Sequence, residues 1–284
     1  MVRHEAATTP RHTTGPRNIA EPRHTAGATP TSDDHNTLLA WAVFGERTVP
    51  GVWFERYWFK RHEAAYAAFA PFTTGAVVVE AGCGEGYGAA MLARSASRVI
   101  AVDTAADVVE HVRRTYPATT PVRADLQRLP FADATAEVVA NLQVIEHLND
   151  QEAFLAECAR VLRPAGTLVL TTPNRLTFSP GLDTPANPYH TRELAPDELV
   201  SLLEEHFVVT RLWGVWHAPR LRAWERRNGA IVDAQLARPY PQWSAALAER
   251  VRRTAIDDFA LHPDTADTPI TACLDLAVVA YRRP

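Results

Sequence analysis

Residues 77–88 carry the side chains whose types and spacing most clearly predict chemistry. They read Val-Val-Val-Glu-Ala-Gly-Cys-Gly-Glu-Gly-Tyr-Gly, so three β-branched residues lead to a carboxylate and glycine then recurs at every second position. The branched residues favour a buried strand, and the glycines allow a ligand to lie directly against the backbone. A helix-forming run follows at 89–93. This order of strand, glycine loop and helix N-terminus indicates a nucleotide-type site.

The spacing of glycines and acids restricts the class of nucleotide ligand that the loop can bind. A nicotinamide or flavin fingerprint would need its third glycine at Tyr87, and the Gly-Lys-Ser/Thr sequence of a P-loop does not follow. Glu80 can reach an amino or ammonium group, directly or through water. Asp103 can accept two hydrogen bonds from ribose hydroxyls, and Asp125 is placed to bind an adenine amino group. An adenosine-methionine skeleton fits this pattern, with binding residues predicted to be Glu80, Gly82, Cys83, Gly84, Gly86, Asp103, Asp125, Leu126 and Gln143.

The chain resembles the class I S-adenosylmethionine-dependent methyltransferases over residues 76–281. The resemblance implies an enzyme with a Rossmann-like fold that uses S-adenosyl-L-methionine as methyl donor. The segments that carry it are Glu80–Gly86, Val102-Asp103, Ala124–Leu126, Val144–Leu148 and the Val-Leu-Arg-Pro-Ala-Gly run at 161–166.

Other segments are similar to the actinobacterial methyltransferase of methylglucose lipopolysaccharide biosynthesis. This closer resemblance implies O-methylation of glucose units, at the 6-hydroxyl, in a cytosolic α-glucan. Composition and periodicity by themselves indicate no sugar substrate. The segments are Gly45–Pro50, Tyr57–Glu63, Asn187–Leu194, Pro219–Arg222 and Ile231–Gln235.

A sugar hydroxyl is a poor nucleophile, so a base should accept its proton as the methyl group is transferred. His147 follows the predicted fourth strand, beside the expected methyl donor, and an imidazole suits this role near neutral pH. Glu146 could orient the imidazole or be the base itself, and His190 is a second candidate. The alternatives are that His147 caps or packs the next helix and that the loop of His190 is structural.

Glu146 and His147 also resemble the metal-binding pair of the ubiquinone-pathway O-methyltransferases. Those enzymes have a further acid three residues before the glutamate, where this chain has the neutral Gln143. We therefore expect no required Mg²⁺, with Glu146 and His147 the candidate ligands if a metal binds. The residues expected to contact the acceptor are Tyr57, Tyr189, Arg192, His217 and Arg220.

Strands and helices must alternate to bring these residues together. The pattern predicts an α/β fold, a doubly wound Rossmann-like sheet of seven mostly parallel strands, with the ligand beyond the strand carboxyl ends. Residues 214–268, between strands six and seven, are too long for a plain connection and are predicted to form an acceptor-side lid, with a helix at 245–259. The expected strands are 76–80, 98–103, 121–124, 136–142, 166–172, 207–213 and 275–281.

The segment before the first strand divides into two parts. Residues 1–37 are rich in Thr, Pro and His, with few large apolar side chains, and are predicted to be disordered. Residues 38–75 are rich in aromatic side chains and are expected to cover the site, although packing in the core explains most of the rings equally well. A helix is predicted over 55–69, ending before Pro71. The methyltransferase domain is expected to span 76–284.

Bulk properties exclude several classes. The 284 residues carry a net charge of −4, which does not favour nucleic acid binding. The sequence has no apolar run of the ~20 residues that span a bilayer, and its first residues lack the apolar core expected of a secretory signal. The three cysteines lack metal-ligand spacing and suit a cytoplasmic protein. Two other functions remain open: methylation of a small phenolic or quinone acceptor, and a non-catalytic S-adenosylmethionine-binding partner protein. Nothing in the sequence indicates the oligomeric state.

Overall fold

The computed structural model describes residues 47–284. The tail predicted at 1–37 and the start of the predicted aromatic segment lie outside this range. A short turn, η1 (Trp53–Glu55), leads into a long helix, α2 (Arg56–Thr73), and strands and helices then alternate. The first half contains β1 (Val77–Ala81), α3 (Tyr87–Leu92), β2 (Arg98–Asp103), α4 (Ala106–Thr115), β3 (Thr120–Arg123), β4 (Ala136–Leu142), η2 (Ile145–His147), α5 (Gln151–Val161) and β5 (Leu162–Pro173).

The second half of the chain adds three strands and several short helices. These elements are α6 (Arg175–Phe178), α7 (Pro196–Leu203), β6 (Phe207–His217), α8 (Pro219–Asn228), α9 (Ile231–Leu236), η3 (Tyr240–Gln242), α10 (Ala245–Arg252), η4 (Ile256–Asp258), β7 (Phe259–Pro263), η5 (Ile270–Ala272) and β8 (Asp275–Arg282).

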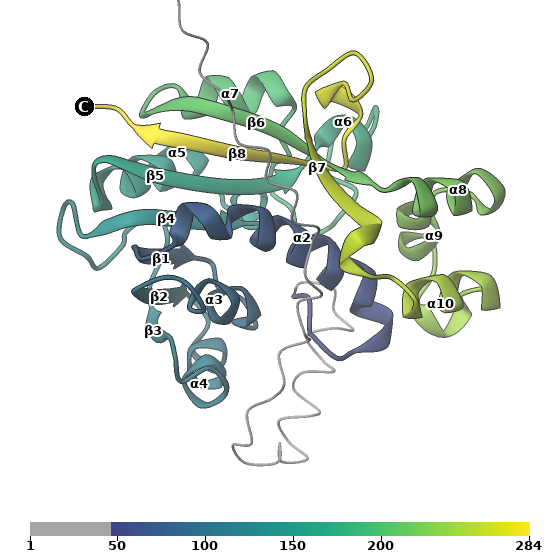
Figure 1. Cartoon of the computed structure of the whole chain (residues 1–284), viewed down its shortest axis with the longest axis horizontal. Helices are drawn as coiled ribbons and strands as arrows, with labels where there is room; N and C mark the ends of the chain where they lie inside the picture. Colours follow the sequence, from purple (N-terminus) through teal and green to yellow (C-terminus); the bar gives the residue numbers. More distant parts are fainter. Residues whose placement is uncertain (1–46) are drawn as a thin grey trace, which may run out of the picture.

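One sheet holds all the strands of residues 47–284, in the order β3-β2-β1-β4-β5-β8-β6-β7. The pairs among β1 to β5 are parallel, whereas β8 is antiparallel to both β5 and β6, and β7 is antiparallel to β6. The chain order reverses between β1 and β4, on either side of which the strands wind outward (Figure 1). This is the switch point at which doubly wound sheets bind ligands.

Alternate residues of each buried strand face opposite sides of the sheet. Val78 belongs to an apolar cluster with residues of α2, α3 and α4, whereas Val79 belongs to a second cluster with residues of α5 and α7. Both faces are therefore covered by helices, which explains why the central strands read as continuous apolar runs rather than as alternating ones.

The prediction of seven strands is wrong, because the described chain has eight. The additional strand, β7, lies inside the insertion and pairs with the extended end of β6. The helix predicted at 245–259 ends at Arg252, and Phe259 begins β7 instead. The sequence of β7 is short and does not clearly alternate between apolar and polar residues, so only its pairing with β6 identifies it as a strand.

Two further boundaries differ from the prediction. Helix α2 continues to Thr73 with Pro71 inside it. Proline in the last turn removes one hydrogen bond, and the helix ends two residues later, so the cost is small. The Arg-Pro-Ala-Gly turn forms a bulge within β5, where the register jumps from Leu162 to Thr167 and Ala165 has a φ of 57°.

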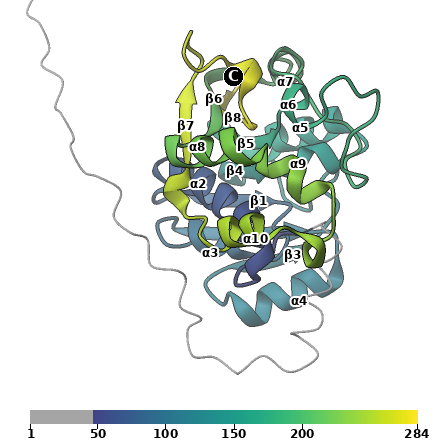
Figure 2. The same cartoon turned by 90° about the vertical axis from the view of Figure 1, so that its right-hand side faces the viewer.

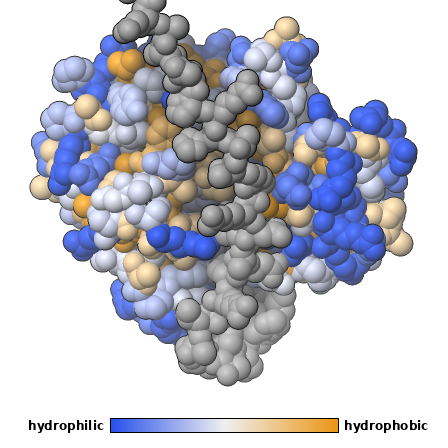
Figure 3. Space-filling model, in the orientation of Figure 1, coloured by the Kyte–Doolittle hydropathy of each residue, from blue (hydrophilic) through white to orange (hydrophobic). Residues whose placement is uncertain are grey.

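Helices α8, α9 and α10 form a lobe beyond one end of the strands (Figures 1 and 2). The lobe follows the carboxyl end of β6, which lies level with the carboxyl end of β5, because β8 pairs Asp275 with both Val215 and Pro173. Hydrophilic residues gather over its surface (Figure 3). None of the helices between residues 47 and 284 has the length and apolar character needed to cross a membrane.

Candidate active site

A cavity of about 560 Å³ lies at the carboxyl ends of the central strands. The glycine loop after β1 lines it, together with Asp103 at the end of β2 and Gln143 after β4. Helix α2 forms another wall, and Phe178 of α6 and Leu236 of α9 lie at the side of the lobe. The volume lies within the roughly 300–1,000 Å³ typical of small-molecule sites.

The glycines of the loop have different roles. Gly82, Gly84 and Gly86 all have positive φ, at 86°, 51° and 99°, a region that glycine adopts without steric cost. A Cβ on Gly84 would meet no protein atom within 4 Å, whereas one on Gly82 would meet Val144 at 2.5 Å. A Cβ on Gly86 would meet α4 at 2.7 Å, and Gly86 does not line the cavity. The prediction that Gly86 contacts the ligand is therefore replaced by a packing role against α4.

Glu80 lies behind the cavity wall rather than in it. Its side chain is 1% exposed, and its Oε1 accepts a hydrogen bond of 2.6 Å from the hydroxyl of Tyr66, which does line the cavity. Oε2 has no partner in the described structure. Burial raises the pKa of Glu80 to about 8, against the hydrogen bond from Tyr66, which lowers it. A buried carboxyl with an unpartnered oxygen would gain most from a nearby cation.

Asp103 presents a carboxylate directly to the cavity. Its Oδ2 accepts a hydrogen bond of 3.0 Å from the backbone N–H of Gly84, and its Oδ1 accepts one of 3.0 Å from Ala105. Each oxygen keeps a lone pair for a ligand hydroxyl. Burial raises the pKa of Asp103, while these backbone donors lower it.

The remaining predicted cofactor residues also reach the cavity wall. Cys83 and Leu126 are buried, and Asp125 is exposed with its Oδ1 held by the backbone N–H of Gln127 at 2.9 Å. Gln143 has a φ of 58°, a strained value for a residue with a side chain, and its N–H donates to Thr171 O at 2.9 Å. The groups around Gly84, Asp103 and Glu80 thus fit a ligand that has ribose hydroxyls and an ammonium group.

His147 makes a hydrogen bond through one ring nitrogen, as His62 of the same cavity does with the hydroxyl of Tyr87. The Nδ1 of His147 lies 2.9 Å from the carbonyl oxygen of Tyr189, so Nδ1 carries the proton and Nε2 keeps a lone pair. The residue lines the cavity. Burial and the neighbouring His190 lower the pKa of His147 to about 4. A neutral imidazole with a free Nε2 can accept a proton.

His190 lies against His147, with ring centroids 4.8 Å apart, but both of its nitrogens are engaged. Nδ1 donates to Glu193 Oε1 at 2.6 Å, and Nε2 accepts from the side-chain amide of Asn187 at 3.0 Å. These contacts orient His190 and leave it no free lone pair. The geometry therefore favours His147 over His190 as base.

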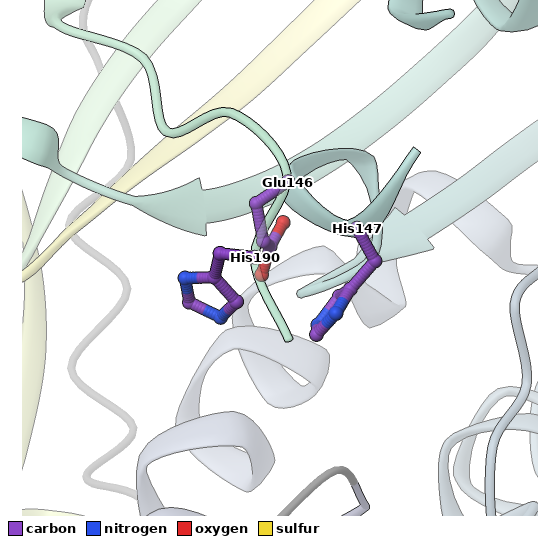
Figure 4. A group of neighbouring side chains, drawn as sticks. All are labelled: Glu146, His147 and His190. Carbon is purple, nitrogen blue, oxygen red and sulfur yellow. The ribbon is translucent and has the colours of Figure 1, made fainter. Parts of the chain in front are cut away.

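The side chain of Glu146 lies beside those of His147 and His190 (Figure 4). Its Oε2 accepts a hydrogen bond of 2.9 Å from the Thr172 hydroxyl, and its carbonyl oxygen accepts from Thr191 and Arg192. Burial raises the pKa of Glu146 to about 8, so the carboxyl group is mostly protonated at pH 7. A protonated carboxyl cannot serve as base, and the tight bonding suggests a role in holding the turn that carries His147.

The three groups do not fit a resident Mg²⁺. Their ligand atoms lie within 4.8 Å of one another, but two of the three are imidazole nitrogens, whereas Mg²⁺ prefers oxygen ligands in octahedral geometry. In addition, His190 offers no free nitrogen, because Glu193 and Asn187 engage both.

The residues predicted to contact the acceptor are not brought together in this cavity. Tyr57 is fully buried, and its hydroxyl lies 2.7 Å from His217 Nε2. Tyr189 contributes its carbonyl oxygen to His147, and Arg192 is held by its backbone, but neither side chain lines the cavity. Arg220 donates to Asp258 at 2.9 Å and ties α8 to η4.

Several cavity residues were missed by reasoning from the sequence. Trp58 and Tyr66 line the cavity from α2, on either side of His62, which already stood out as a polar residue of this helix. The spacing of four residues places all three on one helix face. That spacing could have singled them out once the helix was predicted. Phe178, on the short helix α6, carried no such signal.

Known proteins are similar to this chain in both sequence and fold. Residues 79–170 match a family model described as a methyltransferase domain. A Mycobacterium tuberculosis protein named "Probable S-adenosylmethionine-dependent methyltransferase" is 47% identical over 265 residues, 92% of this chain and 97% of that protein. A Mycolicibacterium smegmatis protein named in the same way is 48% identical over 255 residues, 88% of this chain and 99% of that protein.

A solved structure shares the fold. The 1,6-didemethyltoxoflavin-N1-methyltransferase of Burkholderia thailandensis, with bound S-adenosylhomocysteine, has a TM-score of 0.51 and 16% identity. The match covers 90% of this chain and 92% of that chain.

Proposed function

The chain belongs to the S-adenosylmethionine-dependent methyltransferases, and we propose that it transfers the methyl group to a hydroxyl of a saccharide. The proposed acceptor is the 6-hydroxyl of glucose units in a cytosolic α-glucan, as in methylglucose lipopolysaccharide synthesis. S-adenosylmethionine supplies an electrophilic methyl group on a sulfonium, and its leaving group is a neutral thioether. The work left to the protein is to hold the acceptor oxygen in line and to accept its proton.

The observation that carries the proposal is the free Nε2 of His147 in the cavity. An amine or thiolate acceptor has a ready lone pair, whereas a hydroxyl needs a base close to its oxygen. The bond from Nδ1 to the carbonyl oxygen of Tyr189 holds the imidazole in the tautomer that can accept. In this role His147 takes the hydroxyl proton as the carbon–oxygen bond forms.

The polar groups near His147 support a hydroxyl-rich acceptor. Glu55, Arg61, His62 and Asn187 all line the same cavity and offer both donors and acceptors. Sugar hydroxyls need partners of both kinds. The resemblance of the segments at 57–63 and 187–194 to the methylglucose lipopolysaccharide enzyme supports the same acceptor, since these segments supply three of those four residues.

An aromatic acceptor is the competing possibility. Trp58 and Phe178 line the cavity with ring centroids 6.5 Å apart, which gives it an apolar wall. A phenol or quinol could pack there. Such an acceptor would use the polar groups of the opposite wall less fully.

A transfer assay with labelled S-adenosylmethionine and separate panels of α-1,4-glucans, mannans and phenols tests the proposal. We expect label on the α-glucans. Label on phenols alone would overturn the saccharide assignment and favour the aromatic acceptor. Cofactor binding in calorimetry with no transfer to any acceptor would favour a non-catalytic binding protein.

A further inference from the structure

A second cavity, of about 290 Å³, adjoins the first. Arg61 and Phe178 line both cavities, so they form a shared wall. None of the predicted cofactor residues lines the second cavity. Its volume lies near the lower limit of about 300 Å³ for small-molecule sites, which suits one small unit rather than a second whole ligand.

The polar wall of the second cavity is held in place by a chain of hydrogen bonds. Glu225 Oε2 accepts from His217 Nδ1 at 2.8 Å, and His217 Nε2 accepts from the buried hydroxyl of Tyr57 at 2.7 Å. Glu225 Oε1 accepts from the backbone N–H of Ile231 at 3.1 Å. Because β6, α2, α8 and α9 all contribute to this chain, the Glu225 carboxylate is fixed before any ligand arrives.

Arg61, in the shared wall, is held in place by an ion pair. The guanidinium is 2% exposed and is paired with Asp275 through Nε and Nη2. Its Nη1 is buried without a hydrogen-bond partner in the described structure. An unpaired buried donor costs on the order of 1–3 kcal/mol, but Nη1 exposes less than 1 Å² of surface, so a ligand in the cavity does not reach it in this structure.

The charges around the second cavity favour a neutral ligand. Arg222 and Arg61, whose charge is balanced by Asp275, line the cavity together with two acids, Glu225 and Asp233. A phosphate or carboxylate would meet the two acids, and an amine would meet Arg222. A ring with several hydroxyls can donate to the acids, accept from Arg222 and pack on Phe178 or Trp216.

We propose that the second cavity binds a further sugar unit of the acceptor chain, next to the unit that is methylated. The inference rests on the proposed function and deepens it, because it makes an oligosaccharide rather than a single sugar the preferred substrate. The insertion supplies most of the charged rim through α8 and α9, which gives the predicted lid a role in recognising the acceptor.

Arg222→Ala removes a rim donor, and Arg226→Ala is its matched control. Both arginines are exposed on α8, one turn apart, and only Arg222 lines the cavity. Two quantities are measured on wild type and both variants: kcat/KM for glucose and for an α-1,4-linked glucose tetramer, and the Kd of the tetramer in the presence of S-adenosylhomocysteine. The control must retain wild-type values.

We expect the wild type to prefer the tetramer at least about 10-fold, and Arg222→Ala to lose most of that preference while its activity on glucose stays unchanged. Equal activity of the wild type on glucose and tetramer, or an unchanged preference in Arg222→Ala, would overturn the second subsite and leave the proposed function intact. Failure of the wild type to bind or methylate either saccharide would overturn both.

Discussion

At the scale of single residues, hydrogen bonds distinguish His147, the first candidate for the base, from His190, the second. Spacing placed both His147 and His190 near the methyl donor. The bond from His147 Nδ1 to a carbonyl oxygen leaves Nε2 free, whereas His190 is held at both nitrogens. Tyr189, the partner of His147, lies about forty residues further along the chain, so no local pattern reports it. The partners of His190, in contrast, are its near neighbours Asn187 and Glu193.

Replacement of His147 by alanine is expected to lower kcat by about 10²- to 10⁴-fold, the usual contribution of a general base. The Kd for S-adenosylhomocysteine, measured by calorimetry, should stay near the wild-type value. His190→Gln keeps a polar side chain and should cost much less. A larger loss in His190→Gln than in His147→Ala would reverse the assignment.

The pH dependence of turnover offers an independent check of the same residue. The pKa of His147 is lowered to about 4, so its basic form is present above that pH and is lost as the pH falls through about 4. A nearby sulfonium cation would lower the pKa further. We expect kcat/KM to show no acid-side inflection near 6.5, with folding checked by circular dichroism at each pH. An inflection at 6.5 that vanishes in His147→Ala would contradict this environment.

At the scale of elements, the glycine loop combines two requirements that look alike in sequence. Gly84 leaves open space beside a ligand, whereas Gly86 allows α3 to pack against α4. Regular spacing predicted the same role for both. Only the position of α4, which comes from tertiary packing, separates them.

Gly84→Ala and Gly86→Ala should therefore fail in different ways. Gly86→Ala creates contacts at 2.7 Å with Val112 and 2.9 Å with Tyr116, and overpacking of this kind costs about 1–3 kcal/mol of stability. Gly84→Ala meets no protein atom and should cost less stability but weaken cofactor binding by about 10-fold or more. Thermal unfolding measures the stability of both variants, and calorimetry measures their affinity for the cofactor. Equal losses of stability in the two variants would refute the different roles of the two glycines.

The elements themselves were largely predictable because propensity and burial agree in the central strands. Apolar β-branched runs defined β1, β2, β4, β5 and β8 to within a few residues. The miss at β7 has a physical cause, since an edge strand takes its conformation from pairing with β6. A proline predicts the end of a helix, but it is tolerated in the last turn. Pro71 lies in that turn, and the sequence alone does not show that α2 ends at Thr73.

At the scale of the whole molecule, burial leaves three carboxyl groups in or beside the cavity with raised pKa values. Glu55, Glu80 and Glu146 each have a pKa raised from 4.5 to about 8, with burial as the main cause. Each group therefore contributes stability that is fully present below about pH 4.5 and is lost as the pH rises through about 8. Each contributes a slope on the order of 1 kcal/mol per pH unit in this window.

We expect the ligand-free protein to unfold at a lower temperature at pH 8 than at pH 7. His62 and His147, whose pKa values are lowered to about 4, are neutral in both states over most of this interval and add little. Glu146→Gln should flatten the dependence, whereas Glu152→Gln, an exposed residue on α5, should not. Differential scanning calorimetry supplies the values. A melting temperature that rises from pH 7 to pH 8 would contradict the proposed burial effect.

The residues of the cofactor half of the site could be predicted from the sequence more fully than those of the proposed acceptor half. Loop and strand-end residues such as Gly84, Asp103 and Asp125 are placed by local order alone, and they line the cavity. The proposed acceptor half is assembled from α2, α6 and α9 and from the loop of His190, whose approach depends on the whole fold. For this reason Tyr57, predicted to touch the acceptor directly, lies buried behind His217. His217 holds Glu225 and lines the second cavity rather than the first, so its predicted contact with the acceptor stays a prediction.

The most direct test of the central claim is carbon-13 NMR of an α-1,4-glucan treated with S-adenosylmethionine labelled at the methyl carbon. We predict a new O-methyl signal that correlates with the glucose C6 methylene after incubation with wild-type protein, and its near absence with His147→Ala under the same conditions. Label on phenols only, or a signal of equal strength from His147→Ala, would contradict the account.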